Sequence, residues 1–533
     1  MSQHKKTHPN RRDFLRATAT LGAVAAAGPI LARPLKMGTD TDLGVASGDP
    51  HSDGVVLWTR LPESQHTSTP AVIWEVSLSE IFTSGEIVAS GTVTTSSAVD
   101  YTVKVRVTGL RSFTRYWYRF RLGSWISSVG RTHTAPGAND DVSEVNFAFT
   151  SCQSYPDGLY NVYAALAQDD VHVVAMLGDN IYEGGGSEIR EDTVGSANTL
   201  DQYRAKYRLY LSDPDYREAR RLFPFIHIWD DHEVYNNYAG GGEMDSSQRA
   251  RQAAGYQAFI EYLPVDPTVQ LTTAAGIPAV NLYRRLKYGK LLEFFAIDGR
   301  QYREGQPCGR DFLVYACDDL YAADRTFLGE EQLAWLRSGL VTTDARWKVV
   351  LNPVIMMAMK LTNNMVDILG RVRQDGWVET TEGLLINTDQ WDGFPAERQS
   401  ILGTLEGAGV KNLVVVTGDI HNCFAGLLKT DYTKRFSEPM GVEIVGGSVS
   451  STGIAEVCFG RDLTDLVTAG LKPVNPHITF VDAYFHVYVR MTVTATETLV
   501  SYVAVDTITE KPFEIFDLKS MRIPEGQAAL EDV

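Results

Sequence analysis

The chain has 533 residues and is 44% hydrophobic and 10% aromatic, which is enough for a sizeable buried core and excludes a mainly disordered protein. Its formal net charge of -17 argues against a general nucleic-acid-binding protein, because such proteins need Lys and Arg to displace counterions. The length favours one large domain with a smaller one.

The N-terminus has the pattern of an export signal. The pair Arg11-Arg12 is followed by Phe14-Leu15 and then by the small, apolar run Ala17–Ala32. A charged region before a short apolar region is typical of a signal peptide, and the paired arginines indicate the twin-arginine route. The run is short and rich in Ala and Gly, which argues against a stable membrane span. We expect residues 1–32 to be a twin-arginine signal and the mature protein to have no transmembrane segment.

Residues 41–135 are predicted to form an all-β domain. They contain short runs rich in β-branched and aromatic residues, and Gly, Pro and Ser separate these runs at the spacing of a β-sandwich. The runs are residues 55–58, 71–76, 86–89, 101–107 and 116–122.

After the linker 135–141 the pattern changes to that of an α/β layered domain. Near-continuous apolar runs, typical of strands buried on both faces, alternate with helical stretches. The runs are residues 145–149, 171–177, 224–229, 291–297, 347–351 and 412–416, and the helices are expected at 200–211, 247–263, 330–339 and 398–406. We assign residues 142–520 to this domain, with β-structure at 478–516 completing a sheet edge, and residues 521–533 to a C-terminal tail.

Five cysteines leave one unpaired if the exported protein forms disulfides. Cys308 and Cys317 are nine residues apart around a polar loop and are expected to pair. Cys423 and Cys458 are the second candidate pair. Cys152 would then be the odd thiol, either a metal ligand or a buried, inert side chain.

Metal-ligand side chains recur where hydrophobic runs end. The segments are Thr150–Gln153, Leu177–Tyr182, Trp229–Glu233, Asp389–Gly393 and Thr417–His421. A strand that stops at such a residue places its side chain at the rim of a sheet, and sites of open α/β sheets collect at those ends. Several such strand ends side by side would make a polynuclear metal site.

Within two of these segments, the residue types indicate particular roles. Asp179 could bridge two cations and Tyr182 could give a phenolate to a trivalent metal, although Asp179 could equally cap a turn. Of Asp230 and Asp231, one could hold a metal while His232 donates a proton to a leaving group. The alternative to that reading is a surface acidic cluster.

The remaining side chains with possible roles lie in three places. Asn236 and Asn237 follow the Asp-His-Glu sequence and could each give an amide oxygen to a hard cation. Asp419 and His421 are two residues apart at a strand end and could aim at one site. Asp392 could bind a hard cation and Arg398 could clamp phosphate, although Trp-Asp-Gly also reads as a plain turn. These six residues are Asn236, Asn237, Asp392, Arg398, Asp419 and His421.

Together these motifs closely resemble the PhoD-like alkaline phosphatase family, which is related to the calcineurin-like and purple acid phosphatases. The resemblance covers nearly the whole mature chain and includes Leu43–Pro50, Asp53–Arg60 and Thr326–Leu336. It implies a metallophosphoesterase-like sheet sandwich for the α/β layered domain and a fibronectin type III-like fold for the N-terminal β-domain.

The resemblance also implies one ferric ion (Fe3+) and two calcium ions (Ca2+). It would give the iron to Cys152, Asp179, Tyr182 and His421, and Asp179 would bridge to calcium. The candidate calcium ligands are Asp231, Asn236, Asp392 and Asp419, with Asp230 and Asn237 as alternatives to two of them. Arg398 would hold the phosphate.

The function that this resemblance implies is an exported, metal-dependent alkaline phosphatase of the periplasm or the medium, with the twin-arginine machinery as its partner in export. A metal-bound oxygen nucleophile would hydrolyse phosphomonoesters and phosphodiesters. One alternative is a phosphodiesterase or phospholipase D-type enzyme with aromatic residues in its pocket. The alternative of another class is a non-catalytic exported module with structural metal sites, which would not require His232 and Arg398. No nucleic-acid-binding role is expected.

Overall fold

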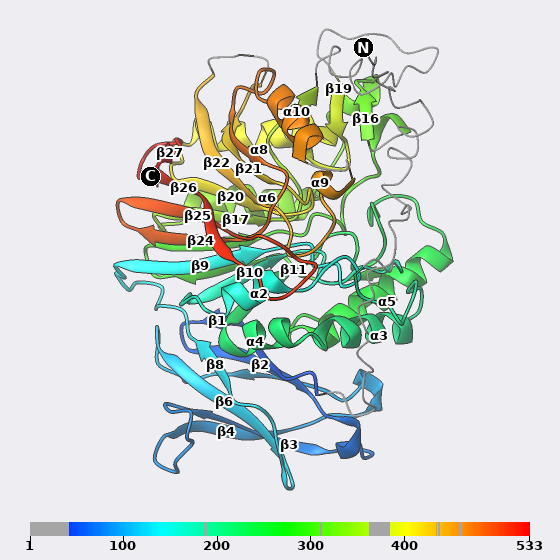
Figure 1. Cartoon of the computed structure of the whole chain (residues 1–533), viewed down its shortest axis with the longest axis vertical. Coiled ribbons are helices and arrows are strands. Elements are labelled where there is room, and N and C mark those ends of the chain that lie inside the picture. The colour runs from blue at the N-terminus through cyan, green and yellow to red at the C-terminus, as the bar shows by residue number, and fades with distance from the viewer. Residues whose placement is uncertain are drawn as a thin grey trace, which may run out of the picture.

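The computed structural model describes residues 42–185, 189–309, 312–361, 384–432, 434, 437–457 and 461–533. The predicted signal and Cys458 lie outside these ranges. Within them, no helix is long and apolar enough to cross a membrane. The chain folds into two large sheets covered by helices, with a further β-sheet layer formed by early strands of the chain, drawn in blue (Figure 1).

The first large sheet has ten strands and contains four neighbouring parallel strands in its middle, β9, β10, β11 and β1. Its order is β27 (Glu531–Asp532), β26 (Ile515–Pro524), β25 (Glu497–Val505), β24 (His486–Thr494), β9 (Glu144–Thr150), β10 (Val173–Leu177), β11 (Pro224–Ile228), β1 (Val45–His51), β2 (Gly54–Arg60) and β5 (Thr102–Val107).

The second large sheet has seven strands, of which β15, β17, β20 and β22 are parallel. Its order is β14 (Arg284–Tyr288), β15 (Leu292–Ala296), β17 (Trp347–Asn352), β20 (Leu413–Thr417), β22 (Pro439–Gly446), β21 (Cys423–Lys429) and β23 (Ile478–Asp482).

The two sheets pack face to face because their central strands are apolar on both faces. Along β10, Val173, Ala175 and Leu177 enter the core between the sheets, whereas Val174 and Met176 face the helices. The side-chain alternation of a strand therefore turns one continuous apolar run into contacts with two layers.

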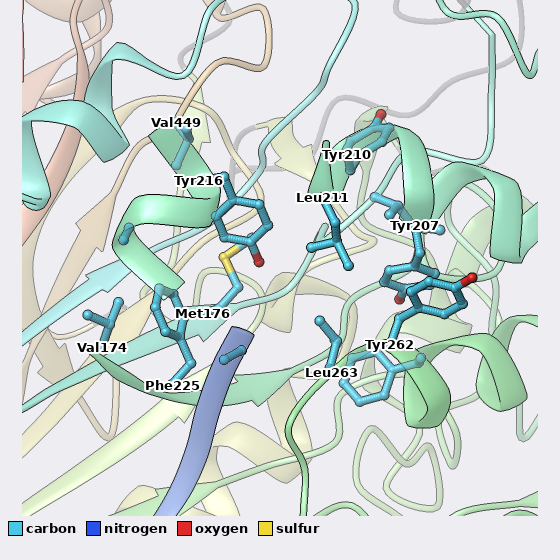
Figure 2. Close-up of a cluster of buried hydrophobic side chains, with 14 of the residues drawn as sticks. Val174, Met176, Tyr207, Tyr210, Leu211, Tyr216, Phe225, Tyr262, Leu263 and Val449 are labelled. Atoms are coloured by element: carbon cyan, nitrogen blue, oxygen red, sulfur yellow. The ribbon is translucent and has the colours of Figure 1, made fainter. Parts of the chain in front are cut away.

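Helices cover the outer faces of both sheets. The ten-stranded sheet is covered by α2 (Asn161–Leu166), α3 (Leu200–Leu211), α4 (Pro214–Leu222) and α5 (Ser246–Tyr262). Figure 2 shows this core, in which Tyr216 of α4 packs beside Met176 and Phe225, and Tyr207 of α3 stacks on Tyr262 of α5. The seven-stranded sheet is covered by α6 (Glu330–Thr342) and α8 (Pro395–Gly407). The α/β layered sheet sandwich expected from the sequence is confirmed.

Shorter elements surround these layers. A three-stranded sheet joins β16 (Phe312–Tyr315), β19 (Leu384–Asn387) and β18 (Lys360–Leu361), and a hairpin joins β12 (Thr272–Ala274) to β13 (Ile277–Ala279). Two helices, α9 (Ile454–Val457) and α10 (Arg461–Leu471), lie between β22 and β23 in the chain.

The N-terminal β-structure shares a sheet with the rest of the molecule. A five-stranded sheet of β4 (Ile87–Thr94), β3 (Ala71–Ser77), β6 (Arg115–Leu122), β7 (Trp125–Ile126) and β8 (Gly130–His133) packs on β1, β2 and β5. However, β1 also pairs in parallel with β11, with Gly48 opposite Phe225. A Cβ at Gly48 would lie 2.4 Å from the carbonyl oxygen of Pro264, so this close approach requires glycine. The three strands β1, β2 and β5 thus extend the ten-stranded sheet.

Two details concern the expectations for the tail and the cysteines. The boundary of the tail at residue 521 is wrong, because it falls inside β26, and β27 then pairs with β26 at the edge of the sheet. Cys308 and Cys317 form the expected disulfide. Cys423 is a buried free thiol, and Cys458, its candidate partner, lies outside the described residues.

Candidate metal centre

The predicted chemical segments follow strands of both large sheets. Cys152 follows β9, Asp179 follows β10, Asp231 follows β11, and Asp419 and His421 follow β20. Four of them have left-handed backbones, with φ of 56° at Cys152, 55° at Asp179, 66° at Asp419 and 57° at His421. Residues other than glycine rarely adopt this conformation, and it is retained where the surrounding structure enforces a functional geometry.

Cys152, Asp179, Tyr182 and His421 lie together. One ligand atom each of Cys152, Asp179 and His421 lies within 4.8 Å of the others. The phenol oxygen of Tyr182 is 2.8 Å from Asp179 Oδ2 and 3.0 Å from His421 Nε2. These four side chains, which we call the Cys152 cluster, come from three separate parts of the chain.

A second group shares Asp179 with the first. Ligand atoms of Asp179, Asp231 and His232 also lie within 4.8 Å of one another. Asp419 lies close enough to Asp231 for the two carboxylates to interact. Burial, followed by the Asp231 carboxylate, raises the pKa of Asp419 to about 7. Asp179 therefore lies where a bridging carboxylate would be needed between two cations.

The arrangement of His421 suits a metal ligand. Its Nδ1 lies 2.8 Å from the carbonyl oxygen of Thr452, which can only accept a hydrogen bond, so Nδ1 carries the hydrogen. Burial lowers the pKa of His421, and the neutral ring then presents an unprotonated Nε2 to the cluster. Such a hydrogen bond from the other ring nitrogen is the usual way to orient a metal-binding histidine.

The charges in this region fit bound cations. Among the described residues, the buried Oδ1 atoms of Asp179 and Asp231 have no hydrogen-bond partner. Burial and then the Asp179 carboxylate raise the pKa of the Cys152 thiol well above its usual value. Unpaired buried carboxylates are costly, and a cation that contacts all of them would offset that cost.

His232 is held beside the two carboxylates by Glu183. Its Nδ1 is 2.6 Å from Glu183 Oε2, and its ring centroid is 4.2 Å from that of Tyr182. Burial disfavours the charged ring, but the carboxylates of Asp231, Asp179 and Glu183 outweigh burial and raise the pKa of His232 well above its usual value. The ring is thus arranged to carry a proton.

The choice between Asp230 and Asp231 is decided by Arg300. Both carboxylate oxygens of Asp230 accept from this buried guanidinium, at 2.5 and 3.1 Å. Asp231 has one oxygen bound to the backbone N–H of Asn237 and the other without a partner in the described structure. Asp231 is therefore the better candidate ligand, and Asp230 fixes the end of β11.

The structure does not bring Asn236 into the cluster. Its side chain is exposed, and its backbone N–H donates to Glu183 Oε1 at 3.0 Å. The neighbouring Asn237 is the one whose backbone reaches Asp231.

Asp392 and Arg398 are also placed differently from the expectation. They form an ion pair at 2.7 Å, and the second oxygen of Asp392 accepts from the backbone N–H of Met359 at 2.8 Å. Arg398 also donates to the carbonyl oxygen of Met356 at 2.9 Å. Both oxygens of Asp392 are thus used outside the cluster, so the expected roles of this pair as calcium ligand and phosphate clamp are corrected to a buried ion pair.

Several residues around the cluster escaped the sequence analysis. Glu233 accepts from the backbone N–H groups of Asp179, Asn180 and Asp230, and so ties the end of β10 to the end of β11. Arg300 also approaches Asp389 at 2.8 Å. The sequence does contain a signal for Arg300, because Asp298-Gly-Arg300 follows an apolar run in the same way as the other segments.

The aromatic residues suggested for a diester pocket are largely core. Tyr160 and Phe424 are fully buried in separate hydrophobic clusters on opposite outer faces of the sheet sandwich. Tyr155 packs at the margin of the first of these clusters. Tyr182 lies at the Cys152 cluster itself.

Comparisons with known proteins agree over nearly the whole chain. A family model for PhoD-like phosphatases matches residues 147–502, and one for their N-terminal domain matches residues 28–136. Alkaline phosphatase D of Bacillus subtilis (strain 168) is 34% identical over 508 residues, which are 92% of this chain and 82% of that protein. A solved structure of PhoD aligns with a TM-score of 0.83 and 32% identity, covering 94% of this chain and 93% of that chain.

These matches define the chain as a phosphoric ester hydrolase. It belongs to the PhoD-like phosphatase family. The reading as a non-catalytic binding module is therefore set aside.

Proposed function

We propose that the chain is an exported, metal-dependent alkaline phosphatase that hydrolyses phosphomonoesters and phosphodiesters. The observation that supports this most directly is the meeting of Cys152, Asp179, Tyr182 and His421, with a buried carboxylate oxygen of Asp179 left without a partner in the described structure. Export rests on the Arg11-Arg12 pair and the apolar run after it.

The Cys152 cluster would hold a ferric ion, and Asp179, Asp231 and Asp419 would hold calcium. Thiolate, phenolate and imidazole suit a transition metal, whereas a site made of carboxylates suits a hard divalent cation. When bound, such cations neutralise the phosphate charge and activate a water molecule.

His232 is proposed to donate the proton to the leaving group. Glu183 fixes its Nδ1, which leaves Nε2 as the nitrogen free to face a substrate. The Glu183 carboxylate beside the ring favours the protonated form, which can donate to the alkoxide that develops on the leaving group.

Metal analysis combined with phosphate release tests this proposal. We expect purified wild-type protein to contain iron and calcium, and to lose phosphate release when a chelator removes them. Asp179→Ala should lose the metals and reduce kcat by about 100-fold or more, because it removes the shared ligand.

Asp392→Asn is the matched control, since it also removes a buried carboxylate charge. It should keep the metals but lose about 3–5 kcal/mol of stability, because Arg398 is left buried without its partner. Undiminished phosphate release from metal-free wild-type protein would refute the metal-dependent reaction.

The range of substrates is tested with p-nitrophenyl phosphate and bis-p-nitrophenyl phosphate. A kcat/KM on the diester that exceeds the monoester value by a large factor would replace the monoesterase assignment with a phosphodiesterase.

A further inference from the structure

The segment between β22 and α9 contacts three of the four residues of the Cys152 cluster, namely the side chains of Tyr182 and His421 and the backbone of Cys152. We call residues Ser448–Thr452 the serine brace. We infer that the brace, through Ser451, is a positioning element that holds Tyr182, His421 and Cys152 at the spacing needed to retain a cation. This inference rests on the proposed function.

Ser451 contacts the phenol oxygen of Tyr182 directly. Its hydroxyl accepts from the backbone N–H of Ser154 at 3.0 Å and donates to Tyr182 Oη at 2.8 Å. A hydroxyl has a single hydrogen, so these two partners fix its direction. Ser451 therefore holds the phenol oxygen of Tyr182 with a donor of fixed direction. The remaining contacts of this oxygen are Asp179 and His421.

The backbone of the brace contacts the ring of His421 and the backbone of Cys152. The carbonyl oxygen of Thr452 accepts from His421 Nδ1 at 2.8 Å, which orients Nε2. The backbone N–H groups of Ser450 and Ser451 donate to the carbonyl oxygen of Cys152 at 3.4 and 3.3 Å. One short segment therefore sets the positions of residues that follow β9, β10 and β20.

The brace is anchored by a chain of polar contacts. Ser448 Oγ donates to the carbonyl oxygen of Ser451 at 2.8 Å and lies 2.9 Å from His486 Nδ1. His486 Nε2 lies 3.0 Å from Glu456 Oε1, and Glu456 Oε2 accepts from the backbone N–H of Gly453. The three serine hydroxyls of the brace are all buried and all hydrogen-bonded, which a simple solvated turn would not show.

Ser448, His486 and Glu456 have the contacts of an acyl-transfer triad, but Ser448 is not a nucleophile. Its side chain is buried, with 1% exposure, and its hydrogen is already donated to a backbone carbonyl. The three residues therefore support the brace rather than forming a second active site.

Metal retention in Ser451 variants tests the inference. Wild-type, Ser451→Ala and Ser451→Thr holoproteins are dialysed against EDTA, and iron and calcium per chain are measured over time. We expect Ser451→Ala to lose iron about 10–100-fold faster than wild type, the usual effect of removing a partner of a metal ligand. Ser451→Thr, which keeps the hydroxyl, should retain iron like wild type. Excess metal in the assay should restore the activity of Ser451→Ala.

Ser127→Ala is the control for a general loss of packing. Ser127 is a buried serine of the N-terminal β-structure that also accepts a backbone N–H and donates to a carbonyl oxygen. It should lose some stability and no metal. If Ser451→Ala fails to fold, metal retention is measured in Ser448→Ala instead, because this change removes the hydrogen bond to the Ser451 carbonyl oxygen.

The outcomes separate the two proposals. Wild-type protein that binds no metal would overturn the proposed function and this inference together. Metal-bearing wild-type protein with Ser451→Ala and Ser448→Ala equally retentive would overturn the brace alone. Iron retention in Ser451→Ala together with iron loss from Ser451→Thr would also overturn it, because the space at this buried position rather than the hydroxyl would then be responsible.

Discussion

Asp179 is held in place by several independent contacts. It has a left-handed backbone, its side chain belongs to both groups of ligand atoms, and its backbone N–H is held by Glu233. The surrounding contacts therefore place one carboxylate between Tyr182 and Asp231 before any cation binds. Such prior placement is what a bridging ligand requires.

His232→Gln tests the role of the ring that Glu183 holds. A general acid matters most when the leaving alkoxide is strongly basic, so kcat on an alkyl phosphate should fall by about 100-fold or more. The fall on p-nitrophenyl phosphate should be much smaller, because nitrophenolate leaves without a proton. Steady-state kinetics on the two substrates measures this difference. Equal losses on both would contradict the role as a proton donor.

The sequence predicted individual site residues well where each follows its own strand. Cys152, Asp179, Tyr182, Asp231, His232 and His421 meet as expected. The errors concern residues whose role depends on long-range pairing. Asp392 looked like a ligand, but only the fold shows that Arg398 and the backbone of Met359 use both of its oxygens. The brace was missed because its Ser-rich sequence, with Gly447 and Gly453 on either side, resembles a turn.

At the scale of elements, the site depends on how closely β10 and β11 approach at their ends. Gly178 has φ of +110°, and a Cβ there would lie 2.6 Å from the Cβ of Asp230. The chain can therefore turn from β10 into Asp179 beside Asp230 only with glycine at this position.

Gly178→Ala should disturb this junction, whereas Gly403→Ala in α8 should not. The first change should lower the free energy of unfolding by more than about 1 kcal/mol and reduce the bound metal, because either the backbone or Asp230 must move. The second adds a Cβ that meets nothing within 4 Å, and should stabilise the helix by about 0.5–1 kcal/mol. Thermal unfolding and metal analysis measure both. A Gly178→Ala protein with unchanged metal content would contradict this account.

Local patterns located the long elements but not their partners. The helix predicted at 200–211 is α3, and the one at 247–263 is α5 within one residue at each end. The helix expected at 398–406 begins earlier, because Pro395 occupies its first turn, where the missing N–H is not needed. The neighbours of β1 could not be predicted, since its parallel pairing with β11 spans more than one hundred intervening residues.

At the scale of the whole molecule, the N-terminal β-structure is held to the main domain by shared strands and by a histidine contact. His133 of β8 packs edge-on against His172, with ring centroids 4.9 Å apart, and Phe113 packs against both. His172 Nδ1 lies 2.9 Å from the backbone nitrogen and 3.2 Å from the carbonyl oxygen of Asn146. Burial lowers the pKa of both rings, which favours their neutral forms at this junction.

This junction should make the protein sensitive to acid. Burial, followed by the neighbouring His172, lowers the pKa of His133 to about 4, with Arg115 lowering it further and Asp170 opposing. As the pH falls, His133 takes up its proton in the unfolded chain before it does so in the folded protein. The stability that the neutral His133 contributes is therefore fully present above about pH 6.5 and is lost between pH 6.5 and 4. The gap between these pKa values corresponds to about 3 kcal/mol.

His133→Phe should remove that loss, because the ring contacts remain and the titrating group does not. Denaturant unfolding at pH 8 and pH 5 measures the difference. The two proteins should differ little at pH 8, and the variant should be the more stable at pH 5. A variant with the same acid sensitivity as wild type would show that a group other than His133 causes the loss of stability in acid.

The pairing of β1 with β11 bears on how the gene can be divided. If the coding sequence were cut in the linker at residues 135–141, neither product would be a closed module: one would carry β1 with an open edge, and the other would expose the edge of β11 next to Asp231. Co-expressed halves would then reunite by strand addition, as in β-augmentation, and hydrolytic activity would report their reunion. The molecule is therefore suited to use as a split reporter enzyme, with the sheet edge as its point of assembly.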